Sequence, residues 1–132
     1  MSYYNDIRIL TTVDGYNYFK KVVEKNCETY DTFNPLEEAD FININEGKNH
    51  VYIGWNDVSW WGNFYYKGAL IIKTALDELP AVGYSYRFAR IGEEFDDIES
   101  IGEEGEKEEE VLDYIEISRK FNDFLFYNKE KI

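Results

Sequence analysis

The chain opens on an alternating pattern of apolar and polar residues. Ile7 and Ile9 share one face of a predicted strand over residues 7–10, and Asp6 and Arg8 take the other face. Side chains of a strand point alternately to opposite faces, so this pattern is typical of a strand with one buried side. We therefore expect Ile7 and Ile9 to lie in the core.

The spacing of apolar residues then becomes helical. Thr11 and Thr12 begin the predicted helix, and Asp14 follows Thr11 at the spacing of a capping box. The apolar positions that repeat every three or four residues are Tyr16, Phe19, Val23 and Cys27. Charged residues line the opposite side, so we expect a core-facing helix that ends between residues 26 and 30. On its buried face Cys27 is predicted to be a core residue, because apolar surroundings raise a thiol pKa and make the thiol inert.

The middle of the chain predicts a hairpin followed by a second helix. Residues 41–45 and 50–55 alternate, and the segment 46–49 between them supplies the turn. The second helix is predicted over residues 64–79, and Pro80 is expected to stop it. Its core-facing positions are Ala69, Ile72, Leu76 and Leu79.

Alternating segments return after the second helix. A fourth strand is predicted over residues 83–91, and its aromatic side consists of Tyr84, Tyr86 and Phe88. Residues 96–101 and 112–117 also alternate, and we expect them to pair with each other. The acidic residues near 102–110 would then form a loop or the tip of a long hairpin.

The predicted order of elements is βαββαβ with one or two extra C-terminal strands. Right-handed crossovers on an antiparallel hairpin lead most simply to an α+β, ferredoxin-like antiparallel sheet. Both helices should pack on one face of that sheet. The expected core is Ile7, Ile9, Phe19, Val23, Ile42, Ile44, Val51, Ile53, Ile72 and Leu76.

Length and composition favour a single domain over residues 1–132. The chain is 44% hydrophobic and 18% aromatic, far from the composition of a disordered protein. No apolar run reaches the roughly 20 residues that span a bilayer, and the first residues lack the pattern of a signal peptide. With a single cysteine no intramolecular disulfide forms. We expect a cytoplasmic protein.

The net charge of −13 is concentrated in one segment. Residues 93–110 contain one base, Lys107, and eleven acids: Glu93, Glu94, Asp96, Asp97, Glu99, Glu103, Glu104, Glu106, Glu108, Glu109 and Glu110. This balance argues against direct binding to nucleic acid or to anionic membranes, because phosphate binding requires clustered Lys and Arg. Like charges repel, so the stretch from Gly102 to Glu110 is predicted to be the least ordered internal segment.

The residue inventory argues against an enzyme. His50 is the only histidine and is expected to be an exposed strand residue. One histidine and one cysteine cannot form a structural zinc site, and no phosphate-binding loop or dinucleotide motif occurs. The spacing of the acidic segment does not match a calcium loop, and a glycosidase acid needs a desolvating cleft. We therefore predict no catalytic residues, no metal and no cofactor.

Large aromatic residues gather between the hairpin and the second helix. Trp55 continues the buried face of its strand and is expected in the core. Trp60 and Trp61 are adjacent and cannot easily both point inward from a loop, so at least one is expected to be partly exposed. Such a tryptophan is either an interface anchor or a lid over the edge of the core.

Three stretches carry a resemblance to a known group: YYNDIRI (3–9), VYIGW (51–55) and YRFARIGEEFDDIE (86–99). In these stretches the chain resembles small acidic proteins encoded by phages and prophages of AT-rich bacteria, a group without an assigned activity. The resemblance implies a setting, the cytoplasm of an infected or lysogenic bacterial host. Small acidic phage proteins of that setting are often inhibitors of host defence, including anti-CRISPR and anti-restriction proteins that imitate the charge of DNA.

The leading hypothesis is a non-catalytic protein that occupies the basic surface of a host nucleic-acid-binding protein. Its protein-binding residues would be the eleven acids of residues 93–110, with Trp60 or Trp61 as an apolar anchor. One alternative is a small-ligand-binding or sequestering domain with an aromatic pocket around these tryptophans, or between the subunits of a homo-oligomer. A second alternative is a structural protein of virion assembly.

Overall fold

The computed structural model describes residues 4–59, 61, 67–108, 112, 113, 115, 117, 121 and 123–126. Its elements in chain order are β1 (Asn5–Thr11), α1 (Val13–Tyr30), β2 (Phe41–Asn45), β3 (His50–Val58), α2 (Lys67–Ala81), β4 (Tyr86–Gly92), β5 (Ile98–Glu103) and the 3-10 turn η1 (Asp123–Phe126). The predicted order of strands and helices is confirmed through β5. Phe64 to Tyr66, the predicted start of the second helix, lie outside the described residues.

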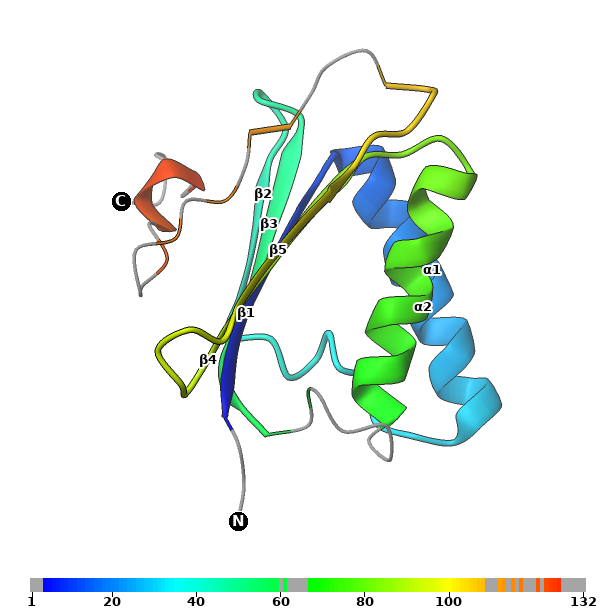
Figure 1. The fold of residues 1–132 in the computed structure, drawn as a ribbon. Helices are drawn as coiled ribbons and strands as arrows, with labels where there is room; N and C mark the ends of the chain where they lie inside the picture. The colour runs from blue at the N-terminus through cyan, green and yellow to red at the C-terminus, as the bar shows by residue number, and fades with distance from the viewer. Residues whose placement is uncertain are drawn as a thin grey trace.

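The strands form one antiparallel sheet in the order β2-β3-β1-β4-β5. Figure 1 shows both helices on one side of this sheet and η1 on the other. The predicted α+β class and the placement of both helices on one face are confirmed.

The main core lies between the sheet and the helices. Ile7 and Ile9 of β1 are fully buried there against Phe19 of α1 and Ile72 of α2. The other expected core residues that are buried are Val23, Val51, Ile53 and Leu76. Trp55 is buried as well, and its indole nitrogen donates a hydrogen bond of 2.8 Å to the Pro35 carbonyl.

The prediction that Ile42 and Ile44 of β2 are buried was wrong. Ile42 is only partly buried, and Ile44 is 42% exposed. β2 is the edge strand next to β3, so its side chains have strand neighbours on one side only. The alternation placed Ile42 and Ile44 on the inner face, but alternation does not reveal that a strand lies at an edge.

The ends of the helices also differ from the predictions. Thr12, not Thr11, caps α1, and its hydroxyl accepts a hydrogen bond of 3.0 Å from the Gly15 N–H. Thr11 belongs to β1, where its hydroxyl donates to the Ser85 carbonyl at 2.8 Å. Pro80 does not stop α2 but lies in its last turn, where one missing N–H removes a single helical bond.

Gly83 provides the actual end of α2. Its φ of +101° is a conformation that glycine adopts without strain. The Gly83 N–H donates to the Pro80 carbonyl at 3.1 Å, and the Tyr84 N–H donates to the Leu79 carbonyl at 2.8 Å. These two bonds form a Schellman motif, which satisfies carbonyls at the helix end.

The C-terminal part of the chain does not extend the sheet as predicted. β5 pairs with β4, with Ile101 opposite Phe88, so the expected pairing of residues 96–101 with residues 112–117 was wrong. Ile115 and Phe126 instead pack against Leu10 on the face of the sheet opposite the helices. Pairing with β4 needs only the short turn after Gly92, whereas pairing with residues 112–117 would have to close a loop of repelling glutamates.

Candidate functional site

The predicted acidic residues follow one edge of the sheet. Glu93, Glu94, Asp96 and Asp97 lie in the turn between β4 and β5. Glu99 and Glu103 are on β5, the edge strand, and the following loop carries Glu104, Glu106 and Glu108. Glu109 and Glu110 lie outside the described residues. We call the nine described acids the acidic edge.

Arg90 of β4 holds the turn end of the acidic edge. Its guanidinium forms a two-point pair with Asp97, at 3.1 Å from Nη1 to Oδ2 and 2.8 Å from Nη2 to Oδ1. The Arg90 Nε lies 3.6 Å from Glu99, and Nη1 also donates to Asn5 Oδ1 at 2.8 Å. The hydrogen bond to Asp97 is the main cause that raises the pKa of Arg90 above its ordinary value. Arg90 therefore connects the turn, β5 and β1.

The loop after β5 is tied to the start of β4. Arg87 is 1% exposed and forms an ion pair with Glu104. The Gly105 N–H donates to Ser85 Oγ at 2.8 Å, and the Ser85 N–H donates to the Glu108 carboxylate. Charge repulsion led us to predict that residues 102–110 are the least ordered internal segment, and this stays a prediction. In the described part of the stretch, polar groups attach the loop to β4 and to Ser85 despite the repulsion.

Part of the acidic edge remains open to solvent. The side chains of Asp96, Glu103 and Glu106 are exposed and have no hydrogen bond or ion pair to another described residue. Phe95 stands among the turn acids and is 79% exposed. The edge therefore presents carboxylates, and one large ring, to any partner that approaches.

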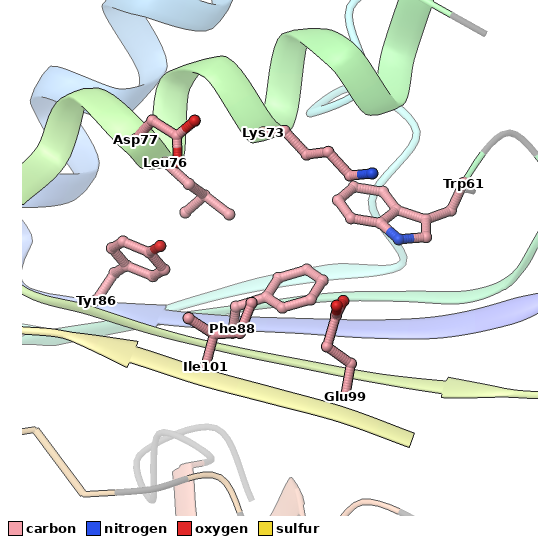
Figure 2. A pocket seen from close by; sticks show the side chains of 8 residues that line it. All are labelled: Trp61, Lys73, Leu76, Asp77, Tyr86, Phe88, Glu99 and Ile101. Carbon is pink, nitrogen blue, oxygen red and sulfur yellow. The ribbon is translucent and has the colours of Figure 1, made fainter. Parts of the chain in front are cut away.

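A pocket of about 200 Å³ opens beside the acidic edge, between α2 and the strands β4 and β5 (Figure 2). Its apolar lining is Trp61, Leu76, Tyr86, Phe88 and Ile101, and its charged lining is Lys73, Asp77 and Glu99. Trp61 stacks on Phe88 with ring centroids 5.2 Å apart, and Lys73 Nζ lies 4.9 Å from the centroid of the Trp61 ring.

Only one of the two adjacent tryptophans can be assessed. Trp61 is 5% exposed, which agrees with a lid over the edge of the core rather than an exposed anchor. Trp60 lies outside the described residues, so the expectation that one of the pair is partly exposed stays a prediction.

Charge in the pocket is predominantly negative. Asp77 comes from α2 and Glu99 from β5, and Lys73 is the one base in the described lining. Tyr86 is nearly buried, and this burial, followed by the charges of Asp77 and Glu103, raises its pKa to about 12.

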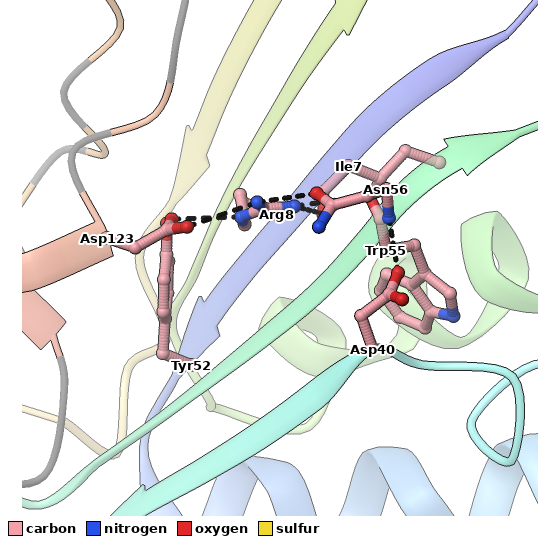
Figure 3. Close-up of polar contacts among 7 residues, drawn as sticks. All are labelled: Ile7, Arg8, Asp40, Tyr52, Trp55, Asn56 and Asp123. Carbon is pink, nitrogen blue, oxygen red and sulfur yellow. Dashed lines mark hydrogen bonds and ion pairs between the residues drawn. The ribbon is translucent and has the colours of Figure 1, made fainter.

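A buried ion pair occupies the opposite face of the sheet (Figure 3). Arg8 is 4% exposed and pairs with Asp123 at 3.0 Å from Nε to Oδ1 and 3.2 Å from Nη2 to Oδ2. Its other N–H groups donate to the carbonyls of Ile7 and Trp55 and to Asn56 Oδ1. All five donors of the guanidinium are thus used. The cluster therefore fixes η1 to the sheet.

Tyr52 and two aromatic rings complete this cluster. The Tyr52 hydroxyl donates to Asp123 Oδ1 at 2.7 Å, and burial is the main cause that raises the Tyr52 pKa far above its ordinary value. The Arg8 guanidinium lies 5.0 Å from the Phe41 ring centroid and 4.7 Å from that of Phe121. A guanidinium this enclosed stabilises packing and is not accessible to a substrate.

His50 is not exposed as expected. It is 8% exposed, and its ring meets Phe126 edge-on at 5.7 Å between centroids. Burial is the main cause that lowers the His50 pKa. The alternating pattern correctly predicted that His50 belongs to a strand. It did not reveal that Phe126 of the C-terminal segment covers the outer face of that strand.

Cys27 is buried on α1, as predicted. Its thiol donates to the Phe33 carbonyl at 3.4 Å, and burial raises its pKa above the ordinary value. A thiol in this state is a poor nucleophile.

Comparison with known proteins adds no relatives. No family model, no curated protein and no solved structure matches the chain. Among the described residues, no group of three His, Cys, Asp or Glu side chains is placed to hold a metal ion. No helix in the described part of the chain is both long and apolar enough to cross a membrane.

Most residues of the pocket lining were not predicted from the sequence. Lys73 and Asp77 were assigned only to a helix, and Ile101 was assigned to a strand with a different partner. Two signals were available: the adjacent tryptophans, around which one alternative placed an aromatic pocket, and the aromatic side of the fourth strand, because Tyr86 and Phe88 line the pocket floor beside Trp61. An alternation pattern indicates that these rings share a face but not that a cavity remains above them.

Proposed function

We propose that this chain is a non-catalytic acidic binding protein that occupies the basic surface of a nucleic-acid-binding protein. The observation that carries the proposal is the acidic edge, nine carboxylates arranged along the β4–β5 turn, β5 and the next loop. Burial of the only histidine and the only cysteine supports a non-catalytic role, because both lack the access that catalysis requires.

The attachment of the edge to the sheet supports this role. Arg90 forms ion pairs with Asp97 and Glu99, and Arg87 forms one with Glu104. These three acids therefore fix the acidic edge to β4. The backbone that carries neighbouring carboxylates such as Asp96 is then held in place before a partner arrives. A preorganised row of charges loses less conformational entropy on binding than a mobile chain does, and it speeds the encounter with a basic surface.

The proposed setting is an infected or lysogenic bacterial host. The resemblance of residues 3–9, 51–55 and 86–99 to small acidic phage and prophage proteins supports it. The protein would act there as an inhibitor of host defence, of the anti-CRISPR or anti-restriction kind, and imitate the charge of DNA.

The proposed fold family is ferredoxin-like. The antiparallel order β2-β3-β1-β4, with α1 and α2 on one face, supports this assignment because a split βαβ unit places its strands in that way. In this scheme β5 is an added edge strand, and it gives the acidic edge its support.

The test uses a partner purified from the host with the tagged full-length chain. The edge variant replaces Asp96 with Asn and Glu103 and Glu106 with Gln. The control variant makes the same change in net charge on other exposed acids, with Gln at Glu24, Glu28 and Glu38. Association rates are measured by surface plasmon resonance across a salt series.

We expect the edge variant to associate about tenfold more slowly at low salt, and the control variant to stay within about twofold of wild type. The difference should shrink at high salt, because the Debye length falls from about 10 Å at 0.1 M to about 3 Å at 1 M. Equal association rates for the edge and control variants would show that the position of the removed carboxylates does not matter, which would contradict the proposal. A wild-type association rate that does not change with salt concentration would also contradict the proposal.

A further inference from the structure

The pocket beside Trp61 has the size of a single-ring ligand. It measures about 200 Å³ and lies between α2 and the β4–β5 edge of the sheet. An apolar cavity of about 150 Å³ is enough to hold benzene. One ring with a short side arm therefore fits, and larger drug-sized molecules do not.

Aromatic surfaces form the inner part of the pocket. Trp61 and Phe88 are stacked at 28° between ring planes, and both line the pocket. Leu76 and Ile101 extend the apolar lining from the helix and from the edge strand. Figure 2 shows these side chains converging on one space. A flat ring gains both apolar burial and stacking in such a place.

The charges of the pocket select for a cation. Asp77 and Glu99 approach from opposite layers, and Lys73 is the single base of the described lining. Figure 2 shows the Glu99 carboxylate directed up from β5 toward Trp61.

Lys73 already demonstrates how a cation is held there. Its Nζ lies 4.9 Å from the centroid of the Trp61 ring, within the range of a cation–π contact. The pocket thus combines a ring that accepts an ammonium with the carboxylates of Asp77 and Glu99. Glu99 also lies 3.6 Å from Arg90 Nε, an ion pair longer than the one between Arg90 and Asp97.

We propose that this pocket binds a compact arylalkylamine, with its ammonium facing the carboxylate of Glu99 and its ring against Trp61 and Phe88. The ligand ring competes with Lys73 for the face of Trp61. This binding activity goes beyond occupation of a basic protein surface, and of the acidic edge it uses only Glu99.

The test measures three probes of similar shape by NMR titration of the full-length chain: 2-phenylethylamine, neutral 2-phenylethanol and anionic phenylacetate. The indole N–H signal of Trp61, assigned with Trp61→Phe, reports the location of binding. We expect the amine to bind with a dissociation constant on the order of 1 mM or below, as suits so small a ligand. The alcohol should bind more weakly, and phenylacetate weakest of all.

Two pocket variants should move affinity in opposite directions. Glu99→Gln removes the carboxylate and should weaken amine binding about fivefold, whereas Lys73→Met removes the competing cation and should tighten it about fivefold. Asp96→Asn makes the same charge change outside the pocket and should leave the affinity within about twofold. Circular dichroism of each variant confirms that the fold is retained.

Several outcomes would overturn the proposal. Tighter binding of phenylacetate, or both pocket variants changing affinity in the reverse directions, would identify an anion site organised by Lys73. Equal weakening by Glu99→Gln and Asp96→Asn would indicate attraction to net charge only. The absence of any Trp61 shift at saturating amine would show that the pocket does not take this class of ligand.

Discussion

His50 lies under the C-terminal segment, with Phe126 against its ring and its Nε2 without a hydrogen-bond partner among the described residues. The groups that act on its charge are Lys48, which lowers its pKa further, and Asp113, which raises it. Burial outweighs Asp113, so the neutral imidazole is the form that this environment favours.

The unfolding free energy should therefore fall as the pH falls below about 6.5, the ordinary histidine pKa. The folded-state pKa is lowered, so the unfolded chain binds the proton first, and acid shifts the equilibrium toward unfolding. Urea unfolding between pH 7.5 and pH 5.5 measures this effect, in a window above the ordinary carboxylate range. His50→Phe should give a flatter profile, and parallel profiles for the two proteins would contradict the assignment.

At the scale of elements, two glycines join the end of α2 to the loop after β5. A Cβ on Gly105 would lie 2.2 Å from the carbonyl carbon and oxygen of Gly83, so the two backbones are in direct contact. The Lys107 N–H also donates to the Gly83 carbonyl at 3.0 Å. The acidic loop is therefore placed by backbone packing as well as by ion pairs.

Gly105→Ala should destabilise the fold by about 1–3 kcal/mol, because backbone atoms cannot move aside as a flexible side chain does. Gly47→Ala is the matched control, since a Cβ there meets only Asn45 Oδ1 at 3.5 Å, an ordinary contact. Thermal unfolding compares the two. Equal melting temperatures would mean that the loop does not pack on α2 in solution.

At the scale of the whole molecule, the sheet carries packed residues on both faces. The helices cover one face, and the described C-terminal residues cover part of the other through Ile115, Phe126 and the pair of Arg8 with Asp123. An arginine this buried is stable only while its carboxylate partner is present, because an unpaired charge away from water is costly.

Asp123→Ala should lower the unfolding free energy by about 3 kcal/mol, since it leaves the Arg8 guanidinium and the Tyr52 hydroxyl without their shared acceptor. Asp113→Ala removes an exposed carboxylate from the same part of the chain and should change stability by less than about 0.5 kcal/mol. Denaturant titration of both variants gives the comparison. A loss no larger than the control's would mean that the C-terminal segment is not docked through this pair.

The local pattern of apolar residues predicted burial correctly where one face of a strand or helix packs on the main core. Ile7 and Ile9 on β1 and Phe19 on α1 were predicted to be buried, and all three are. The candidate site was predicted only in part. The acids of the edge were identified from their density along the chain, and Trp61 was identified from the density of aromatic residues. The arginines that pair with the acids, Arg87 and Arg90, were not identified, because an ion pair between distant residues does not affect local spacing.

The sequence by itself determined the order of strands and helices, since periods of two and of about 3.6 residues are set within each segment by the need to bury one face. Only the tertiary structure decided which strands are neighbours and which side chains meet. β5 satisfies its hydrogen bonds with β4 rather than with residues 112–117, and this choice brings Glu99 and Ile101 beside Trp61. Pairings between distant segments depend on loop closure, packing and charge acting together, and no short window of residues contains that information.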